Sequence, residues 1–273
     1  GGDGGDELFG GYNRYLIANN FWKYLKFIPF ILRNNSDKIL KYLPKSIIIF
    51  LLNFLNEKKY SLNFDLRMID KVIKKIQFIK DENSYYNSMI SQCDFNDTIF
   101  NFKIDNLSIK SDYYLDNDDN NFLDNMMYSD FKSYLHDDIL CKIDRSSMYY
   151  SLETRSPFLD KDIIDYGLNL SSSQKIKNKT SKYLNKKILE KYLPNNLIYK
   201  PKKGFALPIS RWMKKDLKSW VNDVLSKNQL QKHNLFNYNK INQIKNDHFN
   251  DKANNEYLLW SLIQFNQWYD AQE

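Results

Sequence analysis

The sequence predicts a mainly α-helical protein with little or no sheet. Apolar residues recur at helical spacings along much of the chain, and prolines and polar stretches divide it into helix-sized segments. The composition, 42% hydrophobic and 16% aromatic, is sufficient for a hydrophobic core. Helical patterns cover residues 12–33, 37–56, 65–80 and 129–153, and the C-terminal tail around 257–268.

The predicted segments have recognisable boundaries. Pro29 interrupts the first, and Pro44 and the polar stretch at 57–61 break the next two. Residues 116–121 are all Asp or Asn and give the clearest loop prediction, but they lack the spacing of a calcium-binding EF-hand. The tail is expected to form an amphipathic helix that closes the core.

Composition also limits the class of protein. The 273 residues suffice for one large or two small domains, and the longest apolar run, 47–55, is about half the ~20 residues of a membrane span. The net charge of +7 comes from basic residues interleaved with Asp and Asn through most of the chain, so neither a nucleic-acid partner nor a membrane partner is expected. Cys93 and Cys141 show no zinc or disulfide spacing, which favours a reduced, cytoplasmic setting.

The first residues carry the strongest chemical signal. Six of the eight glycines lie among the first eleven residues, together with Asp3, Asp6 and Glu7. Glycines allow close approach of a ligand to the backbone, and Mg²⁺ is commonly held by one or two carboxylates plus phosphate oxygens. The loop therefore predicts a metal-bridged phosphate site. A flexible terminus with solvated acids is the alternative from composition alone.

Two later segments carry charged residues in unusual settings. Residues 129–153 predict a helix with an apolar stripe, and the chain is expected to leave it at Pro157, which would place Glu153 and Arg155 at the helix exit. Residues 182–208 are rich in lysine, and their prolines and Gly204 predict a turn that holds an ammonium group rigidly. A surface helix and a solvated basic loop are the respective alternatives.

The three segments together resemble the synthetase domain of glutamine-hydrolysing asparagine synthetases. The resemblance rests on GDGGDELFGGY at 2–12, on YLHDDILCKIDRSSM at 134–148 with SLETRSPFLD at 151–160, and on KPKKGF at 200–205. It implies an ATP-pyrophosphatase-type enzyme that adenylates the side-chain carboxylate of aspartate. Ammonia then attacks, and asparagine, AMP and pyrophosphate are released.

The resemblance also implies roles for individual residues. Asp6 matches the family's Mg²⁺-pyrophosphate carboxylate, and Lys202 matches the lysine that stabilises charge on the transferring phosphate. Asp3 stands where many members carry a glutamate proposed to accept a proton from ammonia, and Glu153 matches an acid lining the same site. The expected ATP-binding residues are Gly2, Gly4, Gly5, Glu7 and Lys182. We expect Asp3, Asp6, Glu153 and Lys202 to converge on one cleft.

Several positions depart from the family pattern. Gly1 replaces a serine, Asp3 is one methylene shorter than the usual glutamate, and Lys186 and Lys200 stand where arginines are common. Lysine cannot reproduce the two-pronged hydrogen bonding of arginine.

The family's pyrophosphate loop, its parallel sheet and its glutaminase domain are expected upstream of Gly1. Residues 1–273 are therefore expected to be a single partial domain. It would form the helical C-terminal portion of an α/β ATP-pyrophosphatase (adenine nucleotide alpha hydrolase-like) domain.

Three interpretations of function follow. The chain could belong to an asparagine synthetase, with the ATP-binding and glutaminase regions in the same or a separate chain; aspartate and ammonia would then be the substrates. It could instead amidate another carboxylate, such as a sugar acid, or it could be a non-catalytic remnant. A homodimer is also compatible with the sequence.

Overall fold

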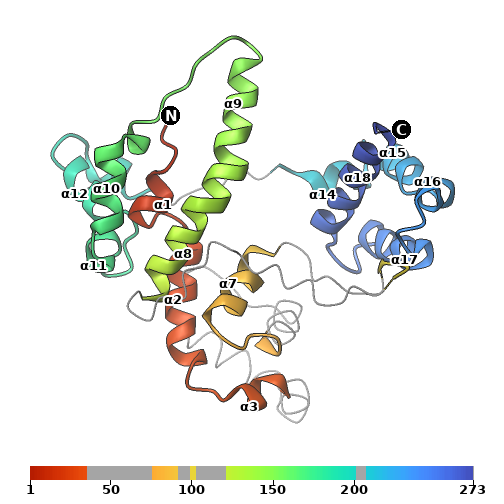
Figure 1. The fold of residues 1–273 in the computed structure, drawn as a ribbon, viewed down its shortest axis with the longest axis horizontal. Coiled ribbons are helices and arrows are strands. Elements are labelled where there is room, and N and C mark those ends of the chain that lie inside the picture. Colours follow the sequence, from red (N-terminus) through yellow and green to blue (C-terminus); the bar gives the residue numbers. More distant parts are fainter. Residues whose placement is uncertain (36–75, 92–98, 103–120, 201–206, 273) are drawn as a thin grey trace. The chain divides into compact units, whose positions relative to one another are not determined.

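The computed structural model describes residues 1–35, 76–91, 99–102, 121–200 and 207–272 (Figure 1). Within these ranges the regular secondary structure is helical, and the only β pairing consists of two isolated bridges, Phe100 with Phe236 and Lys177 with Thr180. The mainly α prediction is thus confirmed for the described part of the chain. The predictions for 37–56, for most of 65–80, for 116–120 and for 201–206 fall outside it.

The chain divides into two compact units, each described here by itself. The first comprises residues 1–90 and 110–200, and the second comprises 91–109 and 201–273. The single partial domain expected from the family resemblance stays a prediction. None of the helices in the described ranges is both long and apolar enough to cross a membrane.

In the part of the first unit that the structure describes, the helices are short apart from one long run. They are α1 (Gly5–Phe9), α2 (Asn13–Leu25), α3 (Phe30–Asn34), α7 (Glu82–Ile90), α8 (Phe122–Asp130), the π-helix η2 (Phe131–Leu140), α9 (Cys141–Met148), the 3₁₀ turn η3 (Pro157–Leu159), α10 (Lys161–Asn169), α11 (Ser172–Lys175), α12 (Tyr183–Leu189) and α13 (Asn195–Ile198). The short helix α1 contacts α8, η2, α10 and α12. The glycine-rich segment is therefore held by several elements of the unit.

The core of the first unit is aromatic. Helices α2, α7 and α8 bury Trp22, Tyr85 and Phe122 against one another, and the Trp22 and Tyr85 rings stack with centroids 5.6 Å apart. Pro29 separates α2 from α3, as predicted, because proline disfavours the helical conformation of the residue before it. In the turn directly after α2 the apolar side chains are not buried, and Phe27 is 78% exposed.

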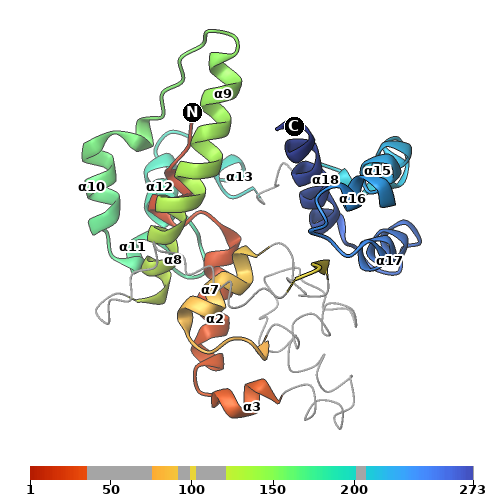
Figure 2. The same ribbon diagram turned by 45° about the vertical axis from the view of Figure 1, so that its right-hand side comes forward.

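Helices α8, η2 and α9 follow one another without a break (Figures 1 and 2). The run starts at Phe122, earlier than predicted, where the side chain of Asn121 accepts a hydrogen bond from the Asp124 amide.

The predicted helix exit at Pro157 is wrong. The helix ends at Met148 because Ser151 adopts a left-handed conformation (φ 56°), and the amides of Leu152 and Ser151 bond to the carbonyls of Ser147 and Met148. This local cap, eight residues before Pro157, stops the helix. Residues 149–156 then form a loop that carries Glu153 and Arg155.

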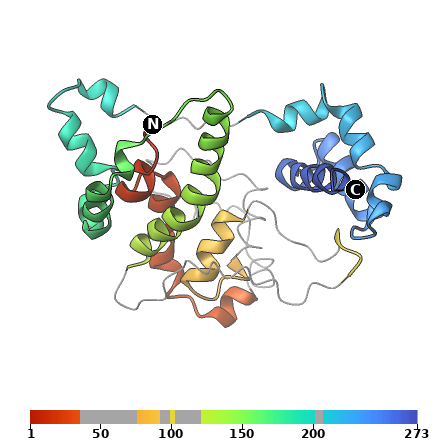
Figure 3. The ribbon, with the colours of Figure 1, turned by 45° about the horizontal axis from the view of Figure 1, so that its top comes forward.

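The second unit has a closed apolar core. Its helices are α14 (Ile209–Lys214), α15 (Lys218–Val224), α16 (Lys227–Lys232), α17 (Tyr238–Phe249) and α18 (Glu256–Asp270). Helix α18 (dark blue in Figure 3) contacts α14, α15 and α17 and buries Leu259, Leu262 and Ile263. The predicted tail helix that closes a core is confirmed, and the core is that of this unit.

Candidate functional site

The glycine-rich stretch folds as the short helix α1, which starts after Gly4. Gly4 has a φ of 86°, a left-handed conformation that residues with a Cβ rarely adopt. A Cβ at this position would also lie 2.6 Å from the side chain of Leu159. Both the turn into α1 and its packing against η3 therefore require glycine at position 4.

The first and second sequence segments lie side by side. The amino group of Gly1 donates to the carbonyl of Arg155 at 2.8 Å, and the Ser156 hydroxyl donates to the carbonyl of Asp3 at 2.6 Å. In Figures 1 and 2 the loop after α9 accordingly returns to the N-terminus. Residues more than 150 positions apart in the chain are thus joined by hydrogen bonds.

Asp6 forms an ion pair with Lys182. The carboxylate Oδ1 and the ammonium Nζ are 2.6 Å apart, and both side chains are only partly exposed. Lys182 precedes α12 in a left-handed conformation (φ 50°). A Cβ at Gly11 would overlap both the Asp6 carboxylate and the Lys182 side chain, so this glycine makes room for the pair. An acid and a lysine predicted for the site therefore meet in the structure.

Glu7 faces the interior. Its side chain is buried, and the Tyr12 hydroxyl donates a hydrogen bond of 2.5 Å to its Oε1. Burial raises the pKa of Glu7, although the hydrogen bond from Tyr12 opposes the shift. Any contribution of Glu7 to ligand binding would therefore act through the shape of the loop and through Tyr12.

Behind the loop lies a buried carboxylate, Asp130 of α8. It is fully inaccessible to solvent and accepts hydrogen bonds from Tyr15 at 2.6 Å, from Tyr86 at 2.8 Å and from Arg14 Nε at 3.1 Å, while Arg14 Nη2 lies 2.7 Å away in an ion pair. Burial lowers the pKa of Arg14, but the charge and hydrogen bond of Asp130, together with Tyr15 and Tyr86, outweigh it and the net shift is upward. Burial and Asp130 together raise the pKa of Tyr15.

The contacts around Asp130 extend towards the glycine-rich loop. The Arg14 guanidinium carbon lies 4.5 Å from the centroid of the Tyr12 ring, whose hydroxyl binds Glu7. A continuous set of contacts therefore links the acidic helix α1 to α2, α7 and α8. No sequence pattern predicted a site role for Arg14, Tyr15, Tyr86 or Asp130. The only local signal is a carboxylate one turn after Met126 on the buried face of a helix.

The other predicted residues occupy different positions. Asp3 is half-buried at the start of the loop, and Gly2 beside it is exposed. Glu153 is exposed and pairs with Arg155 at 2.7 Å. Lys202 lies outside the described residues, so the convergence of Asp3, Asp6, Glu153 and Lys202 on one cleft stays a prediction.

The donor set at the loop suits one kind of metal binding only. Among the residues that the structure describes, no three His, Cys, Asp or Glu side chains gather as a metal cage. With Glu7 turned inward, Asp6 is the partly exposed carboxylate next to Lys182. Mg²⁺ is often bound by one carboxylate together with phosphate oxygens, and this arrangement fits such a complex better than a bare cation.

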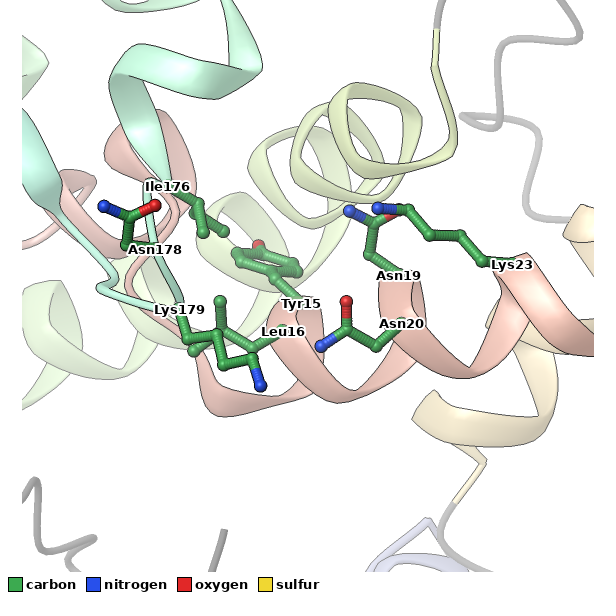
Figure 4. A pocket seen from close by; sticks show the side chains of 8 residues that line it. All are labelled: Tyr15, Leu16, Asn19, Asn20, Lys23, Ile176, Asn178 and Lys179. Carbon is green, nitrogen blue, oxygen red and sulfur yellow. The ribbon is translucent and has the colours of Figure 1, made fainter. Parts of the chain in front are cut away.

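A separate small hollow lies between α2 and the turn at 176–179 (Figure 4). Its volume is about 170 Å³, and it is lined by Tyr15, Leu16, Asn19, Asn20, Lys23, Ile176, Asn178 and Lys179. None of the predicted site residues lines it. Its only link with the contacts described above is Tyr15, whose hydroxyl is bound to Asp130.

With this geometry in place, the chain can be compared with known proteins. It belongs to the asparagine synthase family, whose model matches residues 1–270. It is 30% identical to asparagine synthetase (glutamine-hydrolyzing) 1 of Bacillus subtilis (strain 168), over 98% of this chain and 39% of that protein. It is 26% identical to asparagine synthetase (glutamine-hydrolyzing) 3 of the same strain, over 49% of the chain and 23% of the relative. No solved structure gives a significant match.

The family resemblance inferred from the three motifs is thereby confirmed. The chain spans about two fifths of the length of the first of these relatives.

Proposed function

We propose that this chain is part of an ATP-dependent amidotransferase that converts aspartate to asparagine with ammonia derived from glutamine. The observation that carries the proposal is the Asp6–Lys182 ion pair, 2.6 Å long, in a glycine-rich loop that also contacts residues 155–159. An acid and a cation side by side can serve a metal–phosphate complex, the acid facing the metal and the cation facing phosphate oxygens.

Each residue of the site has a role in this proposal. Asp6 would hold Mg²⁺ jointly with phosphate oxygens of ATP, and Lys182 would bind the same phosphates. The backbone of Gly2, Gly4 and Gly5 would line the nucleotide, with Glu7 fixing the loop from inside through Tyr12. Lys202, outside the described residues, would stabilise the charge that develops on the transferring phosphate.

The proposed reaction proceeds in two displacements. The side-chain carboxylate of aspartate attacks the α-phosphorus of ATP and releases pyrophosphate, which leaves an acyl-adenylate. Ammonia then attacks the acyl carbon, a carboxylate in the site accepts one proton, and AMP departs as asparagine forms. Asp3, at the start of the loop, and Glu153 are the proposed proton-accepting carboxylates for this second step.

The remainder of the enzyme would supply ATP positioning and ammonia. Support comes from the length of the first relative and from an apolar surface on the first unit. Between α9 and α13, Tyr149, Tyr150 and Tyr192 are 75–81% exposed. Exposed apolar side chains of this kind favour contact with another protein part, and we propose that the ATP-binding region covers them.

The test is AMP formation from ATP, aspartate and ammonia. We expect none from the 273-residue chain, because in this proposal the remainder of the enzyme positions the nucleotide. A fusion with the part of the Bacillus relative that the match does not cover should restore turnover. In that fusion, Asp6→Asn and Lys202→Ala should each lower kcat by about 10²–10³-fold, since each removes a charge at the phosphates.

Lys142→Ala, which removes an exposed lysine paired with Asp138, is the matched control and should leave turnover unchanged. Turnover by the chain alone would show that the missing part is dispensable. AMP release with another carboxylate, but not with aspartate, would replace aspartate as the acceptor. A fusion that folds and binds ATP but forms no AMP with any acceptor would favour a non-catalytic remnant.

A further inference from the structure

Helix α12 carries a second lysine towards the site. Lys186 lies one turn after Lys182, and its amide donates to the Lys182 carbonyl at 2.9 Å. Although Lys182 precedes the helix in a left-handed conformation, its ammonium group is near enough to Lys186 for the two charges to interact. Lys186 is therefore a neighbour of the ammonium group that binds Asp6.

The contacts of Lys186 differ from those of Lys187 beside it. Lys187 forms an ion pair with Glu190 at 2.9 Å, and Glu190 also accepts a hydrogen bond of 2.6 Å from the Tyr199 hydroxyl. The Lys186 ammonium instead lies 5.4 Å from the centroid of the Tyr199 ring. Among the described residues, no carboxylate forms an ion pair with Lys186.

The local charge is therefore unbalanced. Asp6 is paired with Lys182, which leaves Lys186 as an additional positive charge held on an aromatic ring. Partial burial lowers the pKa of Lys186, and the neighbouring Lys182 lowers it further. Two adjacent cations with only one paired acid leave a net positive charge. This charge favours the binding of an anion that carries several negative charges.

Tyr199 lies between Lys186 and the third sequence motif. Tyr199 directly precedes the lysine-rich segment that starts at Lys200, and Glu190 fixes its hydroxyl. Helix α12 thus connects the acidic loop, through Lys182, with the beginning of the third motif, through Lys186 and Tyr199.

We propose that Lys186 is a further anion-binding residue of this site, which contacts phosphate oxygens together with Lys182 and is held in place by the ring of Tyr199. The proposal rests on the phosphate site described under the proposed function and deepens it. Lysine here acts as a point charge, and an arginine should serve at least as well because it donates more hydrogen bonds in a fixed plane.

The first test uses the 273-residue chain with Mg²⁺ and inorganic pyrophosphate as the probe. Lys186→Ala should weaken pyrophosphate binding by about tenfold, the usual effect of losing one hydrogen bond to a charged group, and Lys186→Arg should preserve it. Lys187→Ala is the matched control, because its partner is Glu190, and it should bind like the unaltered chain. Thermal unfolding of each variant shows whether the fold is kept.

The second measurement reads individual side chains and remains informative when binding is weak. Millimolar Mg²⁺-pyrophosphate should slow acetylation of the Lys182 and Lys186 amines, quantified by mass spectrometry, and leave Lys187 unaffected. Protection of Lys182 without Lys186, or equal binding by the Lys186→Ala variant and the unaltered chain, would overturn the role of Lys186 and leave the proposed function intact. Protection of neither lysine would overturn both.

Discussion

The two units of the chain bury their side chains in different ways. In the second unit, α14–α18 enclose an apolar core with fully buried residues such as Met213, Val221 and Leu259. In the described part of the first unit, the carboxylate of Asp130 is fully buried, while many large apolar side chains from α9 to α13 remain exposed. A closed apolar core stabilises its own unit, whereas buried charge and exposed apolar area usually serve a site or a partner.

The difference also concerns how far along the chain the contacts reach. Asp130 is bound by Arg14 and Tyr15, more than a hundred residues earlier, and Asp6 is bound by Lys182. In the second unit, apart from the bridge of Phe100 to Phe236, the core joins helices that all lie within residues 209–270, and α18 contacts α14 and α15 as well as the preceding α17. We therefore expect the two units to respond separately to substitution.

The largest effect is expected at the buried charge of the first unit. Asp130→Asn leaves the Arg14 guanidinium without its counter-charge and should destabilise this unit by about 3–5 kcal/mol. Hydrogen exchange followed by mass spectrometry measures protection in each unit separately. Protection should fall in α2, α7 and α8 and stay unchanged in α14–α18.

Asp138→Asn provides the control for Asp130, because Asp138 forms an exposed pair with Lys142 that is worth about 0.5 kcal/mol or less. Equal loss of protection in both units after Asp130→Asn would show that they fold as one cooperative body.

A somewhat smaller effect is expected from a cavity in the second unit. Leu259 of α18 is completely buried, and Leu259→Ala should destabilise this unit by about 2–4 kcal/mol through lost contacts and an unfilled volume. The neighbouring Tyr257 is 45% exposed, so Tyr257→Ala should change stability little. Loss of protection around Asp130 in the Leu259 variant would contradict the independence of the two cores.

The smallest effect is a pH dependence confined to the second unit. Burial lowers the pKa of His248, and the nearby charge of Lys214 lowers it further. Since the unfolded chain binds the proton more tightly, the stability of this unit should be constant above the ordinary histidine pKa of about 6.5 and fall as the pH decreases below it. The slope is limited to about 1.4 kcal/mol per pH unit for one proton.

The control for His248 is another histidine in a different environment. His248→Gln should remove this dependence between about pH 6.5 and 5, as measured by denaturant unfolding followed by tryptophan fluorescence. Most tryptophans of the chain, Trp212, Trp220, Trp260 and Trp268, belong to the second unit. His136→Gln changes an exposed residue of the first unit and should leave the profile unaltered. An unchanged slope in the His248 variant would assign the titration to another group.

The sequence by itself determined the family, the helical fold class and several helix boundaries. These features are local: glycines and acids within eleven residues, a proline that separates α2 from α3, and an apolar stripe that becomes α18. Local patterns are readable because backbone conformation and helix periodicity depend on neighbouring residues. The predicted end of α9 is wrong because Ser151 adopts a left-handed conformation there. A glycine would have indicated such a conformation in the sequence, and a serine does not.

Only the tertiary structure decided which charged groups meet. In the sequence, Asp6 and Glu7 are adjacent carboxylates, and residue type alone does not show which of them faces a ligand. Folding turns Glu7 inward onto Tyr12 and leaves Asp6 to Lys182. It also buries Asp130 among Arg14, Tyr15 and Tyr86, residues that no spacing connects. Burial and distance set the strength of an ion pair, and both arise from packing between segments far apart in the chain.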